Sequence, residues 1–80
     1  MDHSPKPRVY ADFNNADAQG RLRLICSGTK EDLQRLNIKL TEGMHLTLYT
    51  EDLESNGMVT FSEEENIWVA VIDWNAVKDI

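Results

Sequence analysis

The chain has 80 residues, a formal net charge of −6 and a single cysteine. One cysteine excludes an internal disulfide and a zinc site built from several cysteines of one chain. No apolar run approaches the ~20 residues that span a bilayer, and the first eight residues lack the apolar segment of a secretory signal. A chain this short forms one small domain with little room for a catalytic cleft. We therefore expect a reduced, cytoplasmic, non-enzymatic protein without cofactor or membrane segment.

Charge is distributed unevenly along the sequence. Residues 1–40 contain seven basic and five acidic residues, whereas residues 41–80 contain nine acidic residues and one basic residue, Lys78. Such an asymmetry can mark a polar surface for a partner, although solvated turns rich in glutamate give the same pattern. A negative protein repels phosphate backbones, so nucleic acid is a disfavoured partner.

The start of the chain predicts a leader followed by a strand. Residues 1–7 are polar, contain two prolines and lack apolar periodicity, which is typical of a flexible arm. The single domain is therefore expected over residues 8–80. Within residues 9–13 the apolar positions alternate, which favours a strand. Residues 14–20 are rich in Asn and Asp and end in glycine, a composition typical of a turn.

A second strand is expected over residues 21–26. Leu22, Leu24 and Cys26 share its apolar face, so Cys26 is expected to be a small buried hydrophobe.

A helix of about two turns should follow the second strand. Thr29 is its expected cap, with two acidic residues at the positive helix start. Leu33 and Leu36 share a face that should cover an open end of a barrel, and Asn37 can end the helix in a left-handed conformation.

Residues 40–72 predict three consecutive antiparallel strands that carry most of the core. Residues 44–49 alternate strictly between apolar and polar side chains, and residues 58–61 repeat the pattern. Residues 67–72 are apolar throughout and rich in β-branched residues, which is typical of a strand covered on both faces.

Turn residues separate these runs. Glu42-Gly43 supplies a glycine where the chain reverses into the first strand. Asn56-Gly57 tolerates the positive φ that tight hairpins require, and Glu63–Asn66 forms a polar turn before the last strand.

The phase of the last strand is ambiguous because its whole run is apolar. We favour the phase that turns Trp68, Ala70 and Ile72 toward the core. The opposite phase would expose Trp68 beside the acidic turn. Residues 73–78 predict a single helical turn that latches Trp74 onto the barrel.

The order of elements favours a mainly β fold: a small SH3-like, partly open barrel of about five antiparallel strands, with one short helix between strands two and three and a C-terminal helical turn. The alternative is an OB-fold, which places its helix between the third and fourth strands. Leu40-Thr-Glu-Gly-Met-His-Leu-Thr-Leu-Tyr, Gly57-Met-Val and Trp68-Val-Ala-Val-Ile-Asp resemble the diverging turn and paired strands of small bacterial SH3-like barrel proteins. Tyr10-Ala-Asp-Phe-Asn-Asn-Ala-Asp and Gly20-Arg-Leu-Arg-Leu extend this resemblance. It implies a fold, and no activity or site residue.

The function that the sequence favours is a non-catalytic protein-interaction module with an acidic face and a basic protein as its partner. Self-association is left open. The candidate binding residues are the carboxylates of the two expected hairpin turns and the neighbouring tryptophan: Glu51, Asp52, Glu54, Glu63, Glu64, Glu65 and Trp68.

Two alternatives compete with this hypothesis. A basic strand face with Tyr10, Arg21 and Arg23 could bind single-stranded nucleic acid by stacking and charge. Nucleophilic catalysis would need Cys26 activated by His45, which the opposite phases of their strands disfavour. No Cys-x-x-Cys or His-x-x-x-His spacing occurs, so no metal site is expected.

Overall fold

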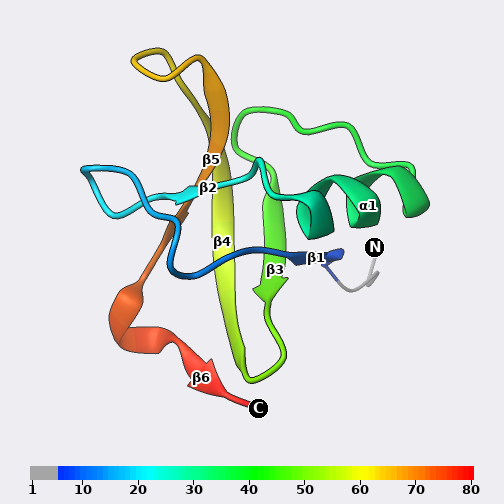
Figure 1. Ribbon diagram of the computed structural model, residues 1–80, viewed down its shortest axis with the longest axis vertical. Coiled ribbons are helices and arrows are strands. Elements are labelled where there is room, and N and C mark those ends of the chain that lie inside the picture. The colour runs from blue at the N-terminus through cyan, green and yellow to red at the C-terminus, as the bar shows by residue number, and fades with distance from the viewer. Residues whose placement is uncertain (1–5) are drawn as a thin grey trace, which may run out of the picture.

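The computed structural model describes residues 6–80. Most of the leader expected over residues 1–7 therefore lies outside the described residues. Figure 1 shows the elements in order: β1 (Arg8–Tyr10), β2 (Leu22–Arg23), α1 (Ser27–Arg35), β3 (His45–Tyr49), β4 (Leu53–Ser62), β5 (Ile67–Ile72), a 3-10 helix (Trp74–Ala76) and β6 (Lys78–Asp79).

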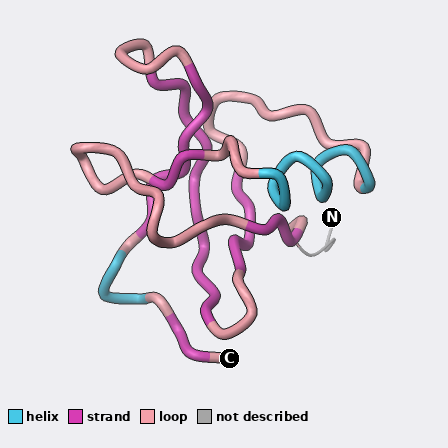
Figure 2. The backbone as a smooth tube through the Cα atoms, in the orientation of Figure 1, coloured by secondary structure: helices cyan, strands magenta, loops and turns pink. Residues whose placement is uncertain are grey.

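The protein is mainly β, and its strands form a curled, open half-barrel (Figures 1 and 2). The strand order is β1-β3-β4-β5-β2, and β6 pairs with the start of β4. The pairs β3–β4, β4–β5 and β5–β2 are antiparallel, but β1 pairs with β3 in parallel. The expectation that all strands are antiparallel was wrong at β1. The intervening chain holds β2 and α1, which is long enough for the crossover that a parallel pair requires.

The meander predicted over residues 40–72 is confirmed as β3, β4 and β5. Gly43 has φ +83° in the turn before β3, and Asn66 has φ +58° at the end of the β4–β5 turn. Both turns therefore lie where the sequence indicated.

The prediction of a hairpin turn at Asn56-Gly57 was wrong. The β3–β4 turn lies at residues 50–52, where the Thr50 amide donates to the Leu53 carbonyl at 2.8 Å. Gly57 lies inside β4, paired with Leu46 of β3 and Ile72 of β5. A Cβ at this position would lie 2.6 Å from Leu48 Cδ1. The glycine is therefore required by side-chain packing across the sheet rather than by a turn.

The first two strands are shorter than expected, although their apolar faces were assigned correctly. Val9, Ala11, Phe13, Leu22 and Leu24 all belong to the buried core. After β1 the chain turns at residue 12, whose side chain accepts a hydrogen bond from the amide of residue 14 at 2.9 Å. Such local bonding ends strand pairing.

Cys26 and Thr29 differ from their predicted roles. The helix begins at Ser27, so half-buried Cys26 is its N-cap residue rather than a buried strand residue. Thr29 lies within α1, is fully buried, and donates its hydroxyl to the Tyr10 carbonyl at 2.5 Å. A long-range acceptor thus replaces the local capping bond.

The helix packs against β1 (Figure 1). Leu33 packs against the core as expected, but Leu36 is 39% exposed. Asn37 has φ +56° just after the helix, which confirms its predicted conformation.

The orientation that we favoured for β5 is the one in the structure. Ala70 belongs to the core, and Trp68 and Ile72 are partly buried against it. Trp68 also packs edge-to-face on Phe61, with ring centroids 5.1 Å apart. Trp74 keeps 46% of its surface exposed, and its indole N–H donates to the Gly20 carbonyl at 2.8 Å.

Candidate functional site

A concave feature lies where the start of β1 faces the end of α1. It is a shallow groove of about 630 Å³. We call it the arginine groove, and its lining residues are Pro7, Arg8, Arg35, Leu36, Ile38 and Tyr49. Two guanidinium groups thus flank a lining that is otherwise apolar and aromatic.

Asp32 of α1 fixes the geometry of the groove. Its Oδ2 accepts from the Tyr10 amide at 2.9 Å and from the Tyr49 hydroxyl at 2.6 Å. Its Oδ1 accepts from Arg35 at 3.1 Å. One nearly buried carboxylate therefore joins the helix to β1 and β3, and it orients two side chains that line the groove.

These contacts shift the pKa values of both partners. Burial alone would raise the pKa of Asp32, but the hydrogen bonds from Tyr49, the Tyr10 amide and Arg35 together hold it below its usual value. The hydrogen bond to the Asp32 carboxylate, with a further contribution from burial, raises the pKa of Tyr49. At neutral pH the pair is therefore a carboxylate and a neutral phenol.

Both groove arginines remain largely accessible. Arg8 stacks over the Tyr49 ring, 4.8 Å from its centroid, and bonds Glu54 through one terminal nitrogen. Arg35 likewise bonds Asp32 through one terminal nitrogen. The side chains of Arg8 and Arg35 are 52% and 63% exposed. Among the contacts of residues 6–80, each guanidinium uses only part of its N–H donors, so the groove can take a ligand that combines an anionic group with an apolar body.

The predicted acidic residues fall into two groups rather than one face. Glu51 and Asp52 are exposed in the β3–β4 turn, and Glu63 and Glu64 are exposed in the β4–β5 turn. These turns lie at opposite ends of β4, a strand of 10 residues (Figure 1). At ~3.4 Å per residue a strand of that length separates them by roughly 30 Å.

The remaining predicted binding residues are engaged within the fold. Glu54 pairs with Arg8 beside the groove, and Glu65 pairs with Arg23. Trp68 packs against the core, so Phe61 is the more exposed member of that aromatic pair.

The residues of the predicted nucleic-acid face do not share one strand. Tyr10 lies on β1 and Arg23 on β2, the first and last strands of the sheet order. Arg21 bonds Asp17 at 2.8 Å, and Arg23 makes a two-pronged bond to Glu65 at 2.7 and 2.8 Å. Both cations are therefore paired with carboxylates, and their side chains are mostly covered, at 19% exposed for Arg21 and 27% for Arg23.

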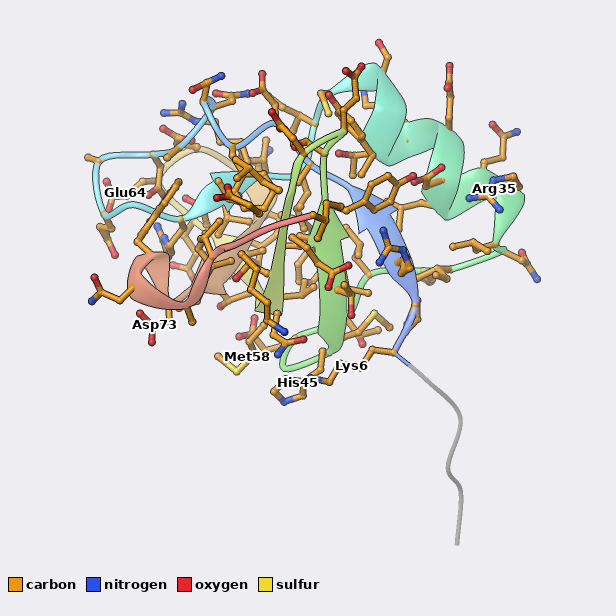
Figure 3. The ribbon with its side chains drawn as sticks, turned by 90° about the horizontal axis from the view of Figure 1, so that it is seen from below. Lys6, Arg35, His45, Met58, Glu64 and Asp73 are labelled. Carbon is orange, nitrogen blue, oxygen red and sulfur yellow. The ribbon has the colours of Figure 1, made fainter. Side chains whose placement is uncertain are left out.

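The proposed catalytic pair is not assembled. The Cys26 thiol bonds the Thr29 hydroxyl at 3.0 Å, whereas exposed His45 stands opposite Met58 on the sheet (Figure 3). Within residues 6–80, no group of three or more His, Cys, Asp and Glu side chains is placed to hold a metal ion. Nor does any helix of this region have the length and apolarity to cross a membrane.

Sequence reasoning missed the arginine groove. Its principal residues, Arg8, Asp32, Arg35 and Tyr49, are widely separated in the chain and form no motif. The excess of basic residues in the first half was the signal that pointed in this direction. Comparison of the chain with protein-family models, curated proteins and solved structures gives no match.

Proposed function

We propose that this protein is a small, non-catalytic interaction module with an SH3-like half-barrel, and that it holds a segment of a protein partner in the arginine groove. The SH3-like assignment is supported by the turn at Glu42-Gly43 that leads into the β3–β4–β5 meander. The helix between β2 and β3 agrees with it.

The observation that carries the proposal is the pairing of two accessible guanidinium groups with an apolar lining in one groove. Each guanidinium is already paired with one carboxylate, Glu54 or Asp32, yet its side chain stays more than half exposed beside a surface that can bury an apolar side chain. Arginine and aromatic residues are enriched where protein partners bind tightly.

Binding explains the site better than catalysis does. Asp32, the carboxyl group that bonds Tyr49 and Arg35 of the groove, has a pKa held below its usual value. A general acid needs the opposite shift to stay protonated near neutral pH. The ionised group acts instead as a hydrogen-bond acceptor that holds these side chains in place.

Selection of peptides from a random phage-displayed library on the full chain tests this function. Enriched peptides would then be synthesised and titrated against wild type, Leu36→Ser and Ile25→Ser. Leu36 and Ile25 are each 39% exposed, but only Leu36 lines the groove. Loss of the apolar contact at Leu36 should weaken binding about tenfold, with Ile25→Ser unchanged. Equal binding by all three proteins, or no enriched peptide, would contradict the proposal.

A second candidate is a basic partner at the β4–β5 turn. Glu63 and Glu64 are exposed there, and Phe61 is an exposed aromatic residue on the same hairpin. Enriched peptides that are rich in Lys and Arg, and that lose affinity for Glu63→Gln/Glu64→Gln but not for Leu36→Ser, would favour this surface over the groove.

A further inference from the structure

β1 is an edge strand, and its two sides are bonded differently. On the inner side, the Thr47 amide of β3 donates to the Pro7 carbonyl at 2.8 Å, and the Ala11 amide donates to the Tyr49 carbonyl at 3.0 Å. Since backbone groups alternate along a strand, Pro7, Val9 and Ala11 bond toward β3. Arg8 and Tyr10 direct their peptide groups to the outer side.

The helix closes only one part of that outer side. At Tyr10 the outward amide donates to Asp32, at 2.9 Å, and the outward carbonyl accepts from the Thr29 hydroxyl, at 2.5 Å. Both partners belong to α1. At Arg8, one strand position earlier on the same side, the strand borders the arginine groove. The outer edge of β1 thus changes from a helix-capped edge to a groove within two residues.

A sheet edge beside a groove is a template for an added strand, because main-chain hydrogen bonds supply affinity and alternate side chains enter pockets. The geometry points to one occupant: an extended, acidic peptide segment that pairs with the outer edge of β1 at Arg8. Its carboxylates would meet Arg8 and Arg35, and an apolar side chain would lie on Leu36, Ile38 and Tyr49. This inference rests on the proposed function and names its ligand class.

Charge and geometry favour this occupant over others. Arg8 and Arg35 both line the groove, one from β1 and one from the end of α1. Both arginines already pair with a carboxylate, but an exposed guanidinium has several N–H donors, so a peptide in the groove can direct its own carboxylates to both. A second copy of this chain could present its own acidic turn, and that occupant is an outcome of the test.

The test uses three synthetic peptides and the full chain labelled with 15N. The first alternates Glu and Val over seven residues, the second replaces every Glu by Gln, and the third is the first peptide N-methylated at two adjacent central residues. Methylation removes an N–H from each edge of the strand while the side chains stay the same. Affinity comes from NMR titration, and hydrogen exchange at the Arg8 amide reports backbone pairing directly.

We expect the Glu peptide to bind at least tenfold more tightly than the Gln and N-methylated peptides, and to slow exchange at the Arg8 amide. Equal binding of the N-methylated peptide without protection at Arg8 would overturn strand addition while leaving the interaction function intact. Failure of the designed peptides and of every library peptide would overturn both. Concentration-dependent dimers that the Glu peptide does not dissociate, and that Arg8→Gln/Arg35→Gln abolishes, would assign the groove to a second copy and overturn the peptide.

Discussion

Two pairs of arginines in this small protein differ in their hydrogen bonding and in the exposure of their side chains. Arg23 uses three guanidinium nitrogens in four hydrogen bonds, to Glu65, Asn15 and the Ala16 carbonyl, and Arg21 bonds Asp17. Their side chains are 27% and 19% exposed, compared with 52% for Arg8 and 63% for Arg35. Arg8 and Arg35 each bond through a single terminal nitrogen.

The difference shows that the bonding of a cation, and not its position in the sequence, decides its role. The bonds of Arg23 join the loop before β2 to the β4–β5 turn, so its charge is used in the fold. Arg8 and Arg35 are also paired with carboxylates, Glu54 and Asp32, but their side chains are much more exposed and border the arginine groove. Figure 3 shows how far apart the two regions lie, with Arg35 at the end of α1 and Glu64 on the opposite side of the molecule.

Removing Asp32 should have the largest effect, because the groove is organised around this carboxylate. Asp32→Ala deprives the Tyr10 amide and the Tyr49 hydroxyl of their acceptor. We expect a loss of about 3 kcal/mol in the free energy of unfolding, measured by urea denaturation at neutral pH. Glu31→Ala is the matched control, since Glu31 is the exposed neighbour on the same helix and should change stability by less than about 0.5 kcal/mol. Similar losses for the two variants would contradict the central role of Asp32.

The contribution of Asp32 to the free energy of unfolding should also depend on pH. Its pKa is lower in the folded protein than in the unfolded chain, so its stabilisation is complete above the unfolded value of about 3.9. The stabilisation is lost as the pH falls through the folded value. The stability gap between wild type and Asp32→Asn should therefore narrow as unfolding is followed from pH 6 down through about pH 4 and below. A gap that widens on acidification would have the wrong sign.

Tyr49→Phe should have a smaller effect, about 2 kcal/mol at neutral pH, because one hydrogen bond to a carboxylate is lost. The pKa of Tyr49 is raised in the folded protein, so its stabilisation is complete below the unfolded value of about 10. It disappears as the pH rises through the folded value. Denaturation at pH 7 and at about pH 11 should therefore show the gap to wild type shrinking. A constant gap would mean that the hydroxyl does not titrate against Asp32.

The last prediction concerns nucleic acid, for which we expect no binding. Since Arg21 and Arg23 are paired with carboxylates and Tyr10 lies on another strand, single-stranded oligonucleotides should give no mobility shift at low salt. A shift that disappears in Arg21→Gln/Arg23→Gln would show that these cations are more available than their bonds imply.

Much of the fold could be predicted because local pattern and turn chemistry agree in the meander. The alternation of residues 44–49 and the turns at Gly43 and Asn66 encode it within short stretches of chain. The prediction of a turn at Gly57 was wrong because the side chain that requires a glycine there, Leu48, lies on another strand. Thr29 was misread as a cap for the same kind of reason, since its acceptor is the carbonyl of Tyr10.

The site could not be predicted because no local pattern unites its residues. Arg8, Asp32, Arg35 and Tyr49 come together only through the parallel β1–β3 pair and the docking of α1 on β1. An alternating strand pattern carries no information about which strand becomes its neighbour. Composition locates the acidic turns, by contrast, but it does not reveal that β4, with 10 residues, separates them.

The most direct test replaces each arginine pair by glutamine and compares the two double variants. Arg8→Gln/Arg35→Gln and Arg21→Gln/Arg23→Gln remove the same charge, and each would be measured for thermal midpoint and for affinity toward the Glu-Val peptide. We predict that the groove variant keeps its midpoint within a few degrees and loses at least tenfold in affinity. The other variant should melt at a distinctly lower temperature and keep its affinity. The reverse assignment, or equal losses of affinity in both variants, would contradict the claim that the groove arginines serve a ligand while the other pair serves the fold.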